Sequence, residues 1–264
     1  MLIKLQTLLF LAAIGALILT CQEEEEEKSK LEFAEVTTTC NESDTEPEVT
    51  EDDITTPPSG AQQYIVGHYD VTKYLLLEKY QVHVFGTAGA SDWMMVNAYE
   101  LARNMIDAIQ TEENRQIFTG HHIFVITDDD PIVPNGIAGQ RNTGNPEYTI
   151  MNEELVCATA VDTIRPDNAP EYRAWDTPIH EFGHSVEIGL GLTATSIQYQ
   201  SENNPDYQEA YGWEYFAWAT ERWFNAKLND QCGTQALPQF EANFLGSVFN
   251  PSNIWKPTCE GKPE

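Results

Sequence analysis

Residues 177–189 read TPIHEFGHSVEIG, and two histidines in this stretch, His180 and His184, are spaced four residues apart. On an α-helix, residues at this spacing lie on the same side, one turn above the other. Two such imidazoles can bind one zinc ion, and Glu181 then lies where a carboxylate can act as a general base on water. We predict that His180 and His184 are metal ligands and that Glu181 is catalytic. The alternative is a core helix that carries two structural histidines.

The segment around these histidines has the residues that begin and end a helix. Thr177 can cap the first amides, Pro178 suits the first helical position, and Gly189 suits the turn that ends the helix. We therefore expect a helix of about three turns over 177–189.

A catalytic zinc site needs a third protein ligand and a fourth position for water. No histidine follows His184, and the positions where a metzincin would carry glycine and histidine hold Glu187 and Leu190. The third ligand is therefore expected to be a carboxylate. Glu187 is available, but it points along its own helix, so a second helix is the better source.

The aromatic-rich segment 204–226 is predicted to be that second helix. It opens with Asp206 and Glu209 in the spacing of a capping box. Within it, Glu214 is followed by apolar residues, and a carboxylate in such surroundings needs a partner. Glu209 and Glu221 remain alternatives for the third ligand.

HEFGH, followed thirty residues after His184 by EYFA, resembles the catalytic domain of anthrax lethal factor and the Pro-Pro endopeptidases, which are zinc peptidases of the gluzincin type. The resemblance covers residues 175–226. It implies a zincin-like fold in which Glu214 is the third zinc ligand. It also implies a catalytic role for Tyr207, seven residues before Glu214, with Tyr211 as the alternative. The chain has no counterpart of the toxin's large binding domains, so toxin delivery is not implied.

Apolar patterns upstream of the histidines predict the sheet. Alternation over 63–71 and 80–86 and apolar runs over 121–127 and 147–159 predict strands. A helical stripe predicts a helix over 91–110, with Ser91 or Asp92 able to cap its start. Strands, a helix, more strands and then helices indicate an α+β domain with one principal sheet. The remaining histidines are interpreted as surface or strand residues: His68, His83, His121 and His122.

The N-terminal part of the chain predicts export. Residues 1–20 carry one early lysine and then an apolar run, as in a secretory signal peptide. Residues 21–60 are acidic and have almost no apolar periodicity, so we expect a disordered tether. The peptidase domain is then expected over 61–264.

Cys21 follows the apolar run and precedes QEEEEE, which resembles the lipidated cysteine and acidic tag of bacterial surface lipoproteins. This predicts a lipid anchor and a location at the cell surface or outer membrane. A cleaved signal peptide and plain secretion are the alternative. The other four cysteines allow two disulfides, for which Cys232–Cys259 and Cys40–Cys157 are the favoured pairs.

The charge of the chain limits its partners. With 42 acidic and 14 basic residues, the formal net charge is −28, which disfavours binding to nucleic acid or anionic lipid. We therefore expect a monomeric zinc endopeptidase with a peptide or protein substrate, and contact with a membrane only through Cys21. The alternative is a non-catalytic surface-binding lipoprotein, such as an adhesin or capture module, on the same scaffold.

Overall fold

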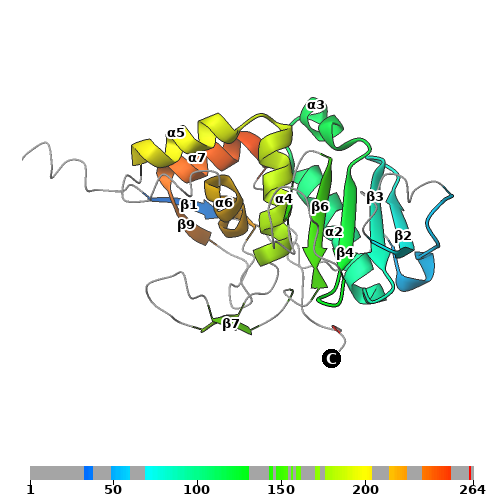
Figure 1. Ribbon diagram of the computed structural model, residues 1–264. Helices are drawn as coiled ribbons and strands as arrows, with labels where there is room; N and C mark the ends of the chain where they lie inside the picture. Colours follow the sequence, from blue (N-terminus) through cyan, green and yellow to red (C-terminus); the bar gives the residue numbers. More distant parts are fainter. Residues whose placement is uncertain are drawn as a thin grey trace, which may run out of the picture.

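The computed structural model describes residues 33–37, 49–59, 69–130, 143–144, 147–153, 156, 159–161, 170–172, 176–203, 214–224, 234–250 and 262. These residues form a mixed α/β structure with a principal sheet and α-helices that pack on the side of its main core (Figure 1). This agrees with the predicted α+β class. No helix in these ranges is both long and apolar enough to span a membrane.

The principal sheet has five strands in the order β2-β3-β4-β6-β5. Their bounds are β2 Val71–Leu77, β3 Val82–Thr87, β4 His122–Ile126, β5 Thr143–Gly144 and β6 Tyr148–Asn152. The central pairs β3–β4 and β4–β6 are parallel, whereas β2–β3 and β5–β6 are antiparallel, so the sheet is mixed. Two short antiparallel pairs lie apart from it: β1 Phe33–Thr37 with β9 Thr234–Pro238, and β7 Thr159–Val161 with β8 Pro170–Tyr172.

Six α-helices are described. They are α2 Asp92–Ala108, α3 Glu112–Arg115, α4 Asp176–Gly189, α5 Thr193–Asn203, α6 Tyr215–Trp223 and α7 Gln239–Val248, with short 3₁₀ turns η1 Glu51–Asp53 and η3 Gln116–Phe118. Helix α2 connects β3 to β4 and contacts both, as a parallel connection requires. Helix α4 packs between β6 and α6, and α5 and α7 lie beyond α6 (Figure 1).

Side chains alternate between the two faces of the sheet, and both faces are apolar. Val84 and Ile123 belong to the main core, which also contains the buried side of α2 and residues of α4, α6 and α7. Their neighbours Phe85 and Phe124 belong to a smaller cluster on the other face. Because both faces are buried, consecutive residues of these strands can be apolar, and the sequence shows apolar runs in addition to the alternation of apolar and polar residues.

Several predicted elements are confirmed. The run 80–86 forms β3, the run 121–127 forms β4, and the stripe over 91–110 forms α2, whose first turn is capped by the Ser91 side chain accepting from the amide of Met94. Two of the histidines that were interpreted as surface or strand residues lie in strands: His83 in β3 and His122 in β4.

Other predictions were wrong in part. The strand predicted over 147–159 ends at Asn152, because a turn follows it. Of strand β2 only its first residue, Val71, was predicted. The predicted strand 63–71 is described only over 69–71, and residues 69–70 lie outside a strand. Helix α4 begins at Asp176, so Thr177 lies inside its first turn instead of capping it. The signal peptide lies outside the described residues. The disordered tether predicted over 21–60 was wrong where it is described: Phe33–Thr37 form β1, paired with β9, Glu51–Asp53 form η1, and Val49 and Ile54 pack against the main core.

Candidate metal centre

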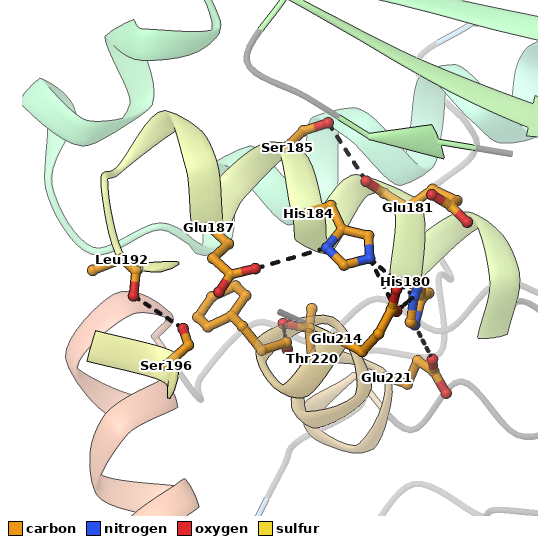
Figure 2. Close-up of polar contacts among 11 residues, drawn as sticks. His180, Glu181, His184, Ser185, Glu187, Leu192, Ser196, Glu214, Thr220 and Glu221 are labelled. Carbon is orange, nitrogen blue, oxygen red and sulfur yellow. Dashed lines mark hydrogen bonds and ion pairs between the residues drawn. The ribbon is translucent and has the colours of Figure 1, made fainter. Parts of the chain in front are cut away.

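Helix α4 carries an apolar side and a polar side. Ile179, Phe182 and Val186 are at most 1% exposed and recur at the spacing of one helical face, which packs into the main core. This burial fixes the rotation of the helix about its axis. His180 and His184 consequently share the neighbouring face, which is directed toward α6 (Figure 2).

Helix α6 can come close to this face because residue 183 is a glycine. A β-carbon at Gly183 would lie 3.2 Å from the Cα of Ala217, which is tighter than an ordinary contact. A small residue on each helix thus permits a close crossing. Glu214 lies immediately before the first residue of α6, and the crossing brings its carboxylate to the two histidines.

Three ligand atoms converge between the helices, and Figure 2 shows their side chains pointing at one another. Glu214 Oε2 lies 2.7 Å from His180 Nε2 and 3.2 Å from His184 Nε2, and the two Nε2 atoms are 3.1 Å apart. Ligand atoms around tetrahedral zinc at 2.0–2.1 Å are separated by about 3.3 Å. The observed triangle is slightly smaller than this, so a small outward adjustment gives the separations of a His₂Glu zinc site. The three residues therefore fit the metal that the sequence predicts.

The three side chains also form an ion-paired cluster. Burial lowers the pKa of His180, but hydrogen bonds with Glu214 and Glu221 outweigh burial and raise the pKa to about 10. Burial raises the pKa of Glu214, but hydrogen bonds with His180 and His184 outweigh it and lower the pKa to about 2. The site thus holds a carboxylate in its charged form, as metal binding requires, and binding a metal cation would replace the proton on His180.

Glu181 has a different environment from Glu214. Burial raises the pKa of its carboxyl group to about 7, against the opposing effect of His180 and His184. A carboxylate with a pKa near neutrality can both accept and return a proton, which is the property of a general acid–base group. The catalytic role of Glu181 stays a prediction, and this environment is compatible with it.

Two rival ligands lie on the outer sides of the imidazoles. Glu221 Oε1 lies 2.6 Å from Nδ1 of His180, and Glu187 Oε2 lies 3.7 Å from Nδ1 of His184. Both carboxylates therefore approach the ring nitrogen opposite to the one that points at Glu214. Neither Glu221 nor Glu187 joins the group of converging ligand atoms.

A buried polar chain connects α4 to the sheet. The Ser185 hydroxyl shares a 2.7 Å hydrogen bond with that of Thr149 in β6, and the Thr149 hydroxyl is 2.9 Å from Nε2 of His121. All three residues are at most 1% exposed. His121, interpreted from the sequence as a surface or strand residue, is thus buried directly before β4. Because such a chain is satisfied in only one arrangement, it helps to fix where α4 lies on the sheet.

The sequence assigned no role to Gly183, and it offered Glu187 and Glu221 only as possible third ligands, not as partners of the outer ring nitrogens. The spacing held a signal for two of them, because Glu187 is three residues from His184 and Glu221 is seven from Glu214, both distances that return to the same helix face. The remaining predicted residues lie outside the described ones: Tyr207, Tyr211, Glu209, His68 and all five cysteines. No protein family, curated protein or solved structure matches the chain.

Proposed function

We propose that this chain is a zinc-dependent endopeptidase with a zincin-like catalytic domain, exported and held at the cell surface or secreted. The observation that carries the proposal is the convergence of His180 Nε2, His184 Nε2 and Glu214 Oε2 to within 3.2 Å of one another. Both histidines lie on α4, the helix that also bears Glu181. The resemblance of HEFGH and EYFA to the gluzincin peptidases supports the same assignment.

In this mechanism His180, His184 and Glu214 would hold zinc, which would supply Lewis-acid activation of water and of the peptide carbonyl. Glu181 accepts the proton of the water molecule as its oxygen attacks the carbonyl carbon. Glu181 then donates that proton to the amine nitrogen as the C–N bond breaks. Burial raises the pKa of this carboxyl group to about 7 in the metal-free protein, and the charge of a bound zinc ion would lower it, which favours the form that accepts the proton.

The negative charge that develops on the carbonyl oxygen needs hydrogen-bond donors. From the resemblance, the hydroxyl of Tyr207 is the proposed donor, and that of Tyr211 is the alternative. Removing one such donor costs about 10²- to 10³-fold in turnover.

The proposal is tested with the full chain by measuring zinc content and digestion of a broad peptide library. About one zinc per chain and chelator-sensitive cleavage are expected. His180→Ala, His184→Ala and Glu214→Ala should each lose zinc and cleavage together, because two ligands hold zinc poorly. His83→Ala is the matched control, since this partly buried strand histidine hydrogen-bonds to Tyr74. Zinc binding without cleavage of any peptide would favour the surface-binding alternative.

A further inference from the structure

We propose that Glu221 and Glu187 are positioning residues that orient the two zinc-binding imidazoles and select their tautomers. The inference rests on the proposed zinc site and deepens it. Each imidazole has its Nε2 on the inner side, toward Glu214, and its Nδ1 on the outer side, toward one of these carboxylates (Figure 2). The two carboxylates come from different helices, Glu187 from α4 itself and Glu221 from α6.

The contact between Glu221 and His180 is a direct hydrogen bond. Its length is 2.6 Å, and the side chains are only 10% and 13% exposed. An imidazole that binds a metal through Nε2 must carry its proton on Nδ1. A carboxylate at Nδ1 accepts that proton's hydrogen bond, excludes the wrong tautomer and makes Nε2 a better electron donor. Glu221 thus prepares His180 for the metal without contacting the metal.

Glu187 lies behind His184 in the same way, but its contact is longer and acts through charge rather than through a hydrogen bond. Its side chain is 1% exposed, Oε2 lies 3.7 Å from Nδ1 of His184, and Oε1 has no hydrogen-bond partner in the described part of the chain. A buried carboxylate with an unsatisfied oxygen is costly, and an apolar side chain there would avoid the cost. The compensation is the charge that Glu187 places behind His184. Because 3.7 Å exceeds hydrogen-bond length, we expect a smaller effect than that of Glu221.

The spacing of these residues agrees with the assignment. Glu221 is seven residues after Glu214, so α6 presents a metal ligand and an orienting carboxylate on one face, two turns apart. Both nitrogens of the His180 ring are consequently held by α6 and its N-cap: Nε2 lies 2.7 Å from Glu214 Oε2, and Nδ1 lies 2.6 Å from Glu221 Oε1. A single element therefore sets the position and the tautomer of this imidazole.

The test is the zinc dissociation constant of the full chain, measured by competition with a chelator at a temperature where circular dichroism shows each protein folded. Outer carboxylates of this kind typically contribute 10- to 100-fold in metal affinity. We expect a loss of about that size in Glu221→Ala, a clear loss in the size-preserving Glu221→Gln, and a smaller loss in Glu187→Gln. The visible spectrum of the cobalt-substituted protein should also change in the Glu221 variants, because it reports the geometry around the metal.

Glu241→Gln is the matched control. Glu241 is a buried carboxylate close to the same helix, but it pairs with Arg222 at 2.6 Å and contacts no metal-binding histidine. This variant is expected to lose stability and to keep the wild-type zinc affinity. The inference is overturned if Glu221→Gln and Glu221→Ala bind zinc as tightly as wild type, or if Glu241→Gln loses as much. A wild-type chain that binds no zinc would overturn the proposed function and this inference together.

Discussion

At the residue scale, the centre is a compact set of opposite charges that are held apart from water. His180 and Glu214 are 13% and 15% exposed and lie 2.7 Å apart, so in the metal-free protein they stabilise one another. Glu181 directly follows His180 in the sequence. The pKa of its carboxyl group is raised, whereas the pKa of Glu214 is lowered. Two carboxyl groups whose pKa values shift in opposite directions suit the proposed roles of metal ligand and proton carrier.

This charge pair predicts how the stability of the metal-free protein depends on pH. The pKa of His180 rises from 6.5 to about 10, so its stabilising contribution is complete below pH 6.5 and is lost as pH rises through 10. The pKa of Glu214 falls from 4.5 to about 2, so its contribution is complete above pH 4.5 and is lost as pH falls through 2. The contribution of this pair should therefore decline on both sides of the window from pH 4.5 to 6.5. The pKa of Glu181, raised from 4.5 to about 7, adds a loss of stability as pH rises from 4.5 through 7. The melting temperature of the chelator-treated chain measures both effects.

Glu214→Gln is the comparison for this pH profile, because it removes the charge and nearly preserves the shape. Its melting temperature should vary less with pH than that of the wild type. Identical pH profiles for the two metal-free proteins would show that the pair contributes nothing to folding.

The sequence was sufficient to predict the three residues that converge, His180, His184 and Glu214. It was insufficient to predict that Glu187 and Glu221 lie at the outer ring nitrogens. The spacing of His180 and His184 places both residues on the same side of a helix. The resemblance to the gluzincin peptidases then indicated Glu214. Whether Glu221 is a ligand or a partner of Nδ1 depends on which ring nitrogen it faces. That is decided by how α4 and α6 cross, which no local pattern of residues specifies.

At the scale of elements, the centre depends on the close crossing of α4 and α6. The crossing requires Gly183, where a methyl group would meet the backbone of Ala217 at 3.2 Å. The apolar face of α4 and the Ser185–Thr149 hydrogen bond hold the other side of the helix on the sheet. The sheet side of α4 therefore resists displacement of the helix. The position of Glu214 depends on the opposite side, where α4 contacts α6.

Gly183→Ala should weaken zinc binding by moving Glu214 away from the histidines. Overpacking costs about 1–3 kcal/mol, whereas alanine gains up to about 1 kcal/mol in helix propensity, so a net loss of stability is expected. The control is Gly246→Ala in α7, where a β-carbon would meet Trp223 at an ordinary 3.7 Å. Zinc titration and thermal melts measure both effects. Tight zinc binding and an unchanged melting temperature in Gly183→Ala would refute the role of the crossing.

The elements themselves were predicted where one pattern dominates. Helix α2 was predicted from a long helical stripe of apolar residues, β3 from regular alternation and β4 from an apolar run. The rest of strand β2 was missed because its pairing with β3 shifts register between Val71 and Lys73, and this irregularity breaks the alternation that reveals a strand. The apolar residues beyond Asn152 prolonged the predicted strand, although a turn separates them from it.

At the scale of the whole molecule, the acidity is unevenly distributed. Residues 22–53 contain fourteen acidic residues and two lysines, so this segment carries −12 of the net −28. The described parts of this acidic segment are nevertheless folded, because residues 33–37 pair with β9 and residues 51–53 form η1. The proposed anchor at Cys21 precedes the segment, whereas the candidate metal centre lies far beyond it in the sequence. The proposed export and the proposed catalysis therefore belong to different parts of the chain and can be tested separately.

Attachment is tested by fractionating cells that express the full chain. If Cys21 is lipidated, the protein should sediment with membranes, because the several acyl chains of a bacterial lipoprotein hold firmly. Cys21→Ser should release it or leave it unprocessed, while the folded protein still binds zinc. A wild-type protein that is cleaved and wholly soluble would contradict the anchor and leave the zinc site unaffected.

The central claim is hydrolysis of peptides by a zinc site whose base is Glu181, and the decisive measurement compares wild type with Glu181→Gln after both full chains are loaded with zinc. Glutamine nearly preserves the shape of glutamate but cannot accept the proton of the attacking water. We expect equal zinc content and a fall in peptide cleavage of about 10²- to 10⁴-fold in the variant. Cleavage by zinc-loaded Glu181→Gln at the wild-type rate would contradict the account.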